Sequence, residues 1–163
     1  MRIGIACAAA LCWSTGLVHA EGLAAAQCNR AWLASDWPTV EIECTQAAEN
    51  LHAEGKSYTE EAVAQSNTGA PEQLVRGGLQ IAVFDFNAAG IYHAKEALGY
   101  YKLKMPGQYG AARDIAAQEF QLAIKGSQLL NMSPALSPAL LDLVRSNEFP
   151  TQAQRSILLN PSP

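Results

Sequence analysis

The stretch that decides the fold runs from Ala24 to Leu51 and reads AAAQCNRAWLASDWPTVEIECTQAAENL. Cys28 and Cys44 stand symmetrically about the Ser35-Asp36-Trp37-Pro38 turn, each eight residues from Asp36. Two antiparallel helices joined at this turn bring residues equidistant from it to the same height, ~12 Å along each helix. The spacing therefore predicts a disulfide between the two helices, in a protein exported to an oxidising compartment. The rival interpretation is a pair of buried, unpaired thiols.

Small and apolar residues recur at spacings of three and four on both sides of that turn, which is the period of a helix face. The pattern predicts one helix from Gly22 to Ala34 and a second helix that begins at the turn. Asp36 is placed to cap the second helix, and Pro38 suits its first turn because no backbone donor is needed there. Gly55 marks the expected end. The sequence thus predicts a disulfide-linked hairpin over residues 21–55.

Residues 1–20 have the pattern of a secretion signal. Arg2 supplies a positive start, an apolar stretch runs from Ile3 to Trp13, and Val18-His19-Ala20 gives the small-residue pattern of a cleavage site. The stretch is too short to span a membrane, which takes ~20 apolar residues. Cleavage would remove two of the four cysteines and leave only the pair about the turn. We therefore expect a bacterial periplasmic or secreted protein with no stable membrane anchor after cleavage.

Length and charge narrow the class of protein further. The chain has 163 residues, with 11 basic and 15 acidic side chains and a formal net charge of −4. Residues 21–163 are the right length for one domain with a core of ordinary size. Acidic and basic residues are interleaved without a basic stripe, so nucleic acid is not an expected partner.

The rest of the chain is also helical in its periodicity. Residues 56–71 are expected to form a polar connector that contains a short helix over 59–63. Residues 71–131 are expected to form a long helical hairpin, with a break at 105–108 and a second helix over 109–130. Two short helices and a tail are expected over 132–163.

The 24–51 stretch resembles one tetratricopeptide-type helical hairpin. Cys28 occupies the small-residue position of the first helix, Asp36-Trp37 occupies the turn, and Ala47 occupies the late alanine of the second helix. A second, longer hairpin over 79–123 is similar, with Ala89-Gly90 as the small pair. Spacing between the two hairpins is irregular, and the long helix exceeds the usual repeat. The resemblance implies an all-α short solenoid of antiparallel hairpins; the alternative is a closed helical bundle.

What the resemblance implies for function is a scaffold that binds a protein or peptide partner noncovalently. The first helices of such hairpins line a concave groove, and Asn29 and Trp32 are rotated away from the cysteine face toward it. Asp85, Tyr92 and Glu96 are the corresponding candidates in the second hairpin. The simpler interpretation is that Trp32 is a packing residue and Asn29 a solvated one.

Other classes of function remain as alternatives. Glu49 and His52 are three residues apart, as are His93 and Glu96, a spacing similar to the Glu-x-x-His pairs of di-iron bundles. The order is reversed in the second pair, so no metal and no cofactor is expected. The sequence contains no serine nucleophile elbow, phosphate-binding glycine loop or metalloprotease motif, so catalytic residues are not expected either. The alternatives are a small periplasmic bundle that binds a ligand or metal, and a secreted effector-type protein.

Overall fold

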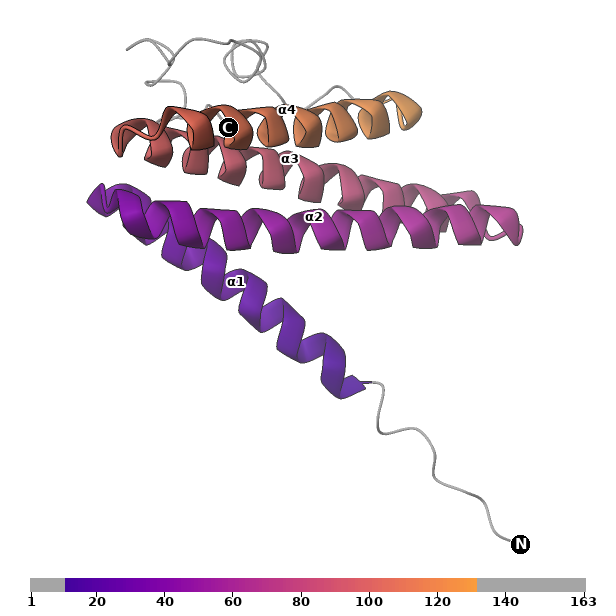
Figure 1. The fold of residues 1–163 in the computed structure, drawn as a ribbon. Coiled ribbons are helices and arrows are strands. Elements are labelled where there is room, and N and C mark those ends of the chain that lie inside the picture. The colour runs from indigo at the N-terminus through magenta and orange to yellow at the C-terminus, as the bar shows by residue number, and fades with distance from the viewer. Residues whose placement is uncertain (1–10, 132–163) are drawn as a thin grey trace, which may run out of the picture.

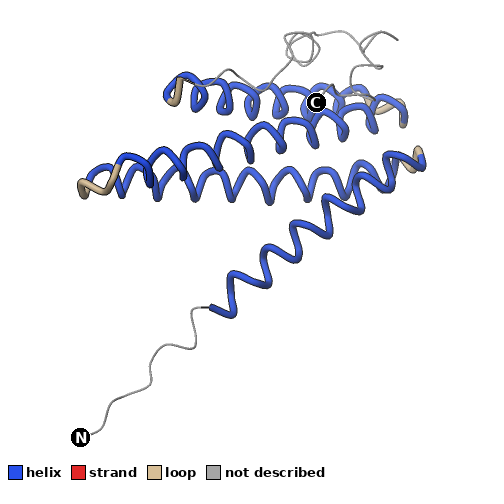
Figure 2. The backbone as a smooth tube through the Cα atoms, turned by 180° about the vertical axis from the view of Figure 1, so that it is seen from behind, coloured by secondary structure: helices blue, strands red, loops and turns tan. Residues whose placement is uncertain are grey.

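The protein is seen in a computed structural model that describes residues 11–131. This part of the chain forms four helices, which are α1 (Leu11–Ala34), α2 (Trp37–Asn67), α3 (Glu72–Lys102) and α4 (Pro106–Leu129). They pack antiparallel as adjacent hairpins (Figure 1), and short turns connect them (Figure 2). The all-α class predicted from the sequence is confirmed.

Each helix packs most extensively against the helix before or after it in the chain, which pairs α1 with α2, α2 with α3 and α3 with α4. Helices α2, α3 and α4 run alongside one another, whereas α1 leaves α2 at a wide angle as it is followed away from their shared turn (Figure 1). Within the described residues, no helix has both the length and the apolar character that a membrane span needs.

The α1–α2 turn has the predicted position. Asp36 is the N-terminal boundary residue of α2, and Pro38 lies in the first turn of that helix. The carboxylate of Asp36 does not cap the backbone; instead it accepts a hydrogen bond of 2.6 Å from the Thr39 hydroxyl. Ser35 adopts a left-handed backbone with a φ of 56°, which reverses the chain direction after α1. The side-chain cap expected of Asp36 is therefore wrong, although its place in the turn is right.

The predicted end of α2 at Gly55 is also wrong. Helix α2 continues to Asn67, so the polar connector expected over 56–71 is instead about three further turns of helix, followed by a short link. Gly55 is buried against α3, where an added Cβ would lie 3.1 Å from Cε1 of the Phe86 ring. The glycine permits close packing of two helices rather than ending one of them.

The starts of α3 and α4 lie near their predicted places, whereas α1 begins eleven residues earlier than predicted. Helix α1 begins at Leu11 instead of Gly22, and α3 begins directly after Pro71. Helix α4 begins at Pro106, three residues before the predicted start. The helices expected within 132–163, and residues 1–10 of the predicted signal, lie outside the described residues.

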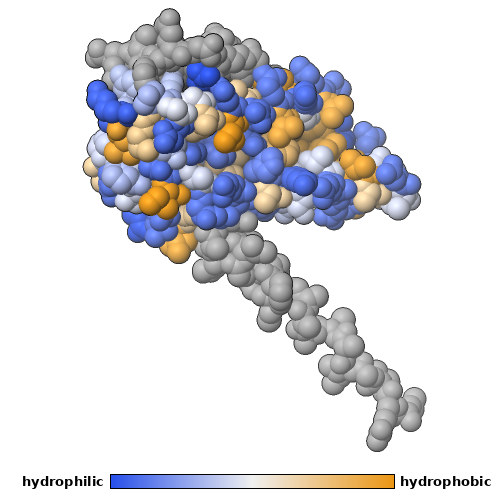
Figure 3. Space-filling view, viewed as in Figure 1, coloured by the Kyte–Doolittle hydropathy of each residue, from blue (hydrophilic) through white to orange (hydrophobic). Residues whose placement is uncertain are grey.

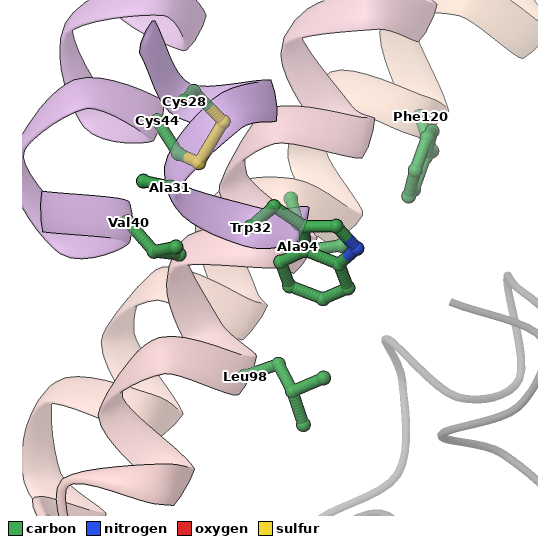
Figure 4. Packing of buried hydrophobic residues seen from close by; sticks show 9 residues of the cluster. Cys28, Ala31, Trp32, Val40, Cys44, Ala94, Leu98 and Phe120 are labelled. Atoms are coloured by element: carbon green, nitrogen blue, oxygen red, sulfur yellow. A yellow bond between two sulfur atoms is a disulfide. The ribbon is translucent and has the colours of Figure 1, made fainter. Parts of the chain in front are cut away.

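The Cys28–Cys44 disulfide is present and joins α1 to α2 with a Cα–Cα distance of 4.8 Å. It belongs to the largest of the three buried clusters of the described residues, and we call this end of the bundle the disulfide half. Figure 4 shows the disulfide and the Trp32 ring, which points toward α3 beside Ala94. The buried members of the disulfide half come from all four helices: Cys28, Ala31, Trp32, Val40, Cys44, Ala94, Leu98, Ala116 and Phe120.

The opposite end of the bundle, which we call the open half, has a much smaller core. Its buried cluster consists of Ala82, Phe86 and Ala123, with the Tyr58 ring packed against it. Only α2, α3 and α4 contribute to this cluster. Figure 3 shows hydrophobic surface among the hydrophilic patches at this end of the molecule. The two ends therefore differ in how completely their apolar residues are covered.

Candidate functional site

A pocket of about 470 Å³ opens in the open half between α2, α3 and α4, and we call it the α3 pocket. Its floor comes from α3, and its two walls come from α2 and α4. The residues that line it are His52, Lys56, Thr59, Glu60, Leu79, Ala82, Val83, Phe86, Leu122, Lys125, Gly126 and Leu129.

The floor and one wall of the α3 pocket are apolar. Leu79, Val83 and Phe86 recur on α3 at spacings of three and four, so they share one face of that helix. On α4, Leu129 is 74% exposed and Leu122 is 37% exposed. An apolar wall left open to solvent is costly unless another apolar group covers it. The pocket therefore has the chemical character of a binding site for an apolar group.

A polar pair closes one end of the α3 pocket. Nδ1 of His52 lies 2.7 Å from Oε1 of Glu119, a contact that bridges α2 and α4. The Glu119 side chain is buried, and its Oε2 has no hydrogen-bond partner among the described residues. Burial raises the pKa of Glu119, and His52 and His93 partly offset that rise. The His52 ring also packs against Phe86, with ring centroids 5.8 Å apart.

A second histidine–glutamate pair lies deeper in the bundle. Nδ1 of His93 is 2.7 Å from Oε2 of Glu96, and both side chains are buried. His52 is paired with Glu119 from α4 rather than with Glu49, the partner its spacing suggested. Within residues 11–131, no three His, Cys, Asp or Glu side chains are placed to hold a metal ion. The two pairs therefore act as polar bridges within and between helices.

Three of the five predicted partner-binding residues come together on α1 and α3. Asn29 donates a hydrogen bond of 3.3 Å to the Tyr92 hydroxyl and accepts one of 2.6 Å from Lys95 Nζ. The Lys95 ammonium lies 5.6 Å from the Trp32 ring centroid and 5.1 Å from that of Tyr92. Burial lowers the pKa of Lys95. We call these four residues the Lys95 cluster.

The Lys95 cluster is largely occupied by its own members. Trp32 is only 8% exposed, so its ring serves mainly as a packing surface, as the simpler interpretation had it. Asn29 remains exposed. The cluster thus offers a partner one polar side chain at its edge rather than an open aromatic surface.

The other two predicted residues lie elsewhere. Asp85 stands beside Gly55, and burial together with the charge of Glu54 raises its pKa to about 6. Glu96 is buried against His93. Neither Asp85 nor Glu96 joins the Lys95 cluster. Burial and the neighbouring Glu96 also raise the pKa of Tyr100 to about 12.

Comparison with known proteins found no relative of this chain. No family model matches the chain, and neither a curated protein nor a solved structure gives a match. The α3 pocket was not predicted from the sequence, although two of its residues carried a signal. Leu122 and Leu129 are seven residues apart, a spacing that places both on one face of α4.

Proposed function

We propose that the protein is a noncovalent binding protein whose α3 pocket receives an apolar group from its ligand or partner. The observation that carries this proposal is the pocket itself, about 470 Å³ in volume with an apolar floor between three helices. Small-molecule sites typically have volumes of ~300–1,000 Å³ and lie between the helices of bundles. The exposed leucines of α4 are then explained as a surface that a ligand covers.

Binding rather than chemistry is proposed because the hydroxyl and imidazole side chains of the pocket are already engaged. The Thr59 hydroxyl donates a hydrogen bond of 2.8 Å to the Gly55 carbonyl. His52 is held by Glu119, with Nδ1 of His52 2.7 Å from Oε1 of Glu119. These contacts fix the walls around an apolar space.

An oxidising compartment is part of the proposal. The Cys28–Cys44 disulfide supports it, because such bonds persist mainly in exported proteins. We propose export with cleavage after Ala20. Expression of the full chain with export, followed by N-terminal sequencing of the product, tests this: an N-terminus at Glu21 is expected, and retention of Met1 in the exported protein would contradict it.

The binding proposal is tested with an apolar fluorescent probe such as anilinonaphthalene sulfonate. Leu122→Glu places a charge on the wall of the α3 pocket, at a position exposed enough to tolerate it. We expect the probe to bind the wild-type chain and to bind this variant about tenfold more weakly, ~1.4 kcal/mol. Leu33→Glu, an equal change at an exposed residue of α1, is the matched control. Equal weakening by both variants would refute the pocket as the site.

A second candidate function is docking of a protein partner at the Lys95 cluster. It is favoured by the convergence of Asn29, Trp32 and Tyr92, which were predicted together as partner-binding residues. Because Trp32 is buried, its replacement would test folding, so the exposed Asn29 is the better probe. Affinity capture from the native compartment should recover a partner with the wild type and lose it with Asn29→Arg. Recovery of the same proteins by both would exclude this surface.

A further inference from the structure

We infer that the ligand of the α3 pocket is an anionic single-chain amphiphile, a molecule with an alkyl tail and a carboxylate or phosphate head. This inference rests on the proposed function, since it names the chemical class that the same pocket takes. It is carried by two features of the pocket, the charge of its rim and the scarcity of hydrogen-bonding groups on its floor.

The rim of the α3 pocket carries two lysines and one glutamate. Lys56 lies one helical turn beyond His52 on α2, and Lys125 lies about one turn beyond Leu122 on α4, so the two ammonium groups flank the floor from opposite walls. This positive bias stands out in a chain whose formal net charge is −4. An anionic head placed between the two walls would be attracted by both lysines.

Neither lysine is strongly engaged by the protein. Lys56 and Glu60 are 3.9 Å apart and both are exposed, a geometry in which an ion pair contributes little. Lys125 has no ion pair within the described part of the chain. Both ammonium groups can therefore contact a head group without first breaking a strong interaction.

The floor favours an alkyl chain over a peptide. A peptide carries a donor and an acceptor in every residue, and each one must find a partner when it is buried. The α3 side of the pocket offers only Leu79, Ala82, Val83 and Phe86, none of which has a hydrogen-bonding side chain. An alkyl tail can cover these residues and the exposed Leu129 without that cost.

The experiment measures displacement of the anilinonaphthalene sulfonate probe from the full chain by four C12 compounds below their micelle concentrations. These are dodecanoate, dodecyl phosphate, dodecanol and dodecyltrimethylammonium. At low salt we expect the anions to bind about 3- to 30-fold more tightly than the alcohol, given the usual strength of two partly exposed charge pairs. A carboxylate preference identifies a fatty-acid head, and a phosphate preference identifies a lipid phosphate.

Replacing both rim lysines separates charge from packing. Lys56→Gln with Lys125→Gln should abolish the preference for anions while leaving dodecanol affinity within about twofold. The matched control is Lys102→Gln with Lys104→Gln, which makes the same change of charge at the last residue of α3 and in the turn that follows it, and should keep the preference.

The outcomes distinguish this inference from the proposed function. Equal or tighter binding of the alcohol or the cation overturns the anionic class and leaves the pocket as an apolar site. Displacement of the probe by an acidic amphipathic peptide, but by none of the four compounds, also overturns it in favour of a peptide partner. If neither the probe nor any compound binds, both the inference and the proposed function fail.

Discussion

The disulfide half and the open half are built from the same three antiparallel helices, yet they differ in what they can do. In the disulfide half, α1 joins the other helices, and Trp32 and Phe120 fill the interior around Cys28 and Cys44. In the open half, the buried cluster contains a single phenylalanine, Phe86, and two alanines. One half has the packing that stabilises the fold, and the other retains an uncovered apolar surface. Under the proposed function, stability and binding therefore belong to opposite ends of the bundle.

The largest expected effect comes from the disulfide, which acts on one half only. The bond links residues separated by 16 positions, and a loop of that length predicts a loss of about 3 kcal/mol of unfolding free energy on reduction. Denaturant unfolding of the full chain with and without reductant measures the loss. The double variant Cys28→Ala with Cys44→Ala should behave like the reduced protein.

Hydrogen exchange of the reduced protein tests whether this loss is local. Amides of α1 and of the first turns of α2 should lose protection first, whereas those around Phe86 should keep more of theirs, because α1 contributes nothing to the buried cluster there. Equal loss of protection in both halves would remove the distinction between them.

A smaller effect comes from one substitution made in each half. A Cβ on Gly90 would lie 2.5 Å from the ring of Phe120, which is fully buried, so Gly90→Ala overpacks the disulfide half at a cost of ~1–3 kcal/mol. A Cβ on Gly126 would meet Cγ2 of Val83 at 2.5 Å, but Val83 lines the α3 pocket, so we expect its side chain to shift toward the pocket. The gain in helix propensity, ~1 kcal/mol, should then make Gly126→Ala nearly neutral.

Thermal or denaturant unfolding of the two alanine variants checks the difference. Gly110→Ala is the control, since a Cβ there meets nothing within 4 Å and should only gain helix propensity. A Gly126→Ala variant as unstable as Gly90→Ala would show that the open half is packed as tightly as the disulfide half.

The smallest predicted effect is a pH dependence in the open half. The pKa of Asp85 is raised from 3.8 to about 6, so the folded state holds a proton that the unfolded state releases between these values. The contribution of Asp85 therefore favours folding less as pH rises from about 4 to 6. Asp85→Asn should increase stability at pH 7 by about 1 kcal/mol, after discounting for partial exposure, and by almost nothing at pH 3.5.

Melting temperatures of the wild type and Asp85→Asn across pH 3.5 to 7.5 measure this effect. Asp114→Asn, at an exposed position on α4, is the control and should leave the pH profile parallel to that of the wild type. A constant difference between Asp85→Asn and the wild type at every pH would contradict the assignment.

Local sequence information was enough to predict the hairpin that carries the disulfide. The offsets of the two cysteines from Asp36, the proline in the first turn of α2 and the helical period all depend on residues close in the chain. The role of Gly55 could not be predicted from local sequence. Whether a glycine ends a helix or admits a neighbour depends on Phe86, which belongs to another helix.

The candidate site was harder to predict for a related reason. Helical period identifies an apolar face such as that of Leu79 and Phe86, but not whether another helix covers it. That Asn29 and Tyr92 would lie on one surface was predicted from the resemblance to helical repeats, which placed each residue on the first helix of its hairpin. The resemblance did not place Glu96 in the interior, because the burial of that turn of α3 depends on the helices that pack against it, although the spacing from His93 was visible in the sequence.

The packing of each helix against the next in the chain has a consequence for how the protein reaches its structure. Partners that are close in sequence find one another quickly, so a chain with this topology has low contact order and is expected to fold on the microsecond-to-millisecond scale typical of helical bundles. Each hairpin can form before the following one is complete. A chain that enters an oxidising compartment N-terminus first can therefore assemble helix by helix, and the Cys28–Cys44 bond can close once α1 and α2 have met.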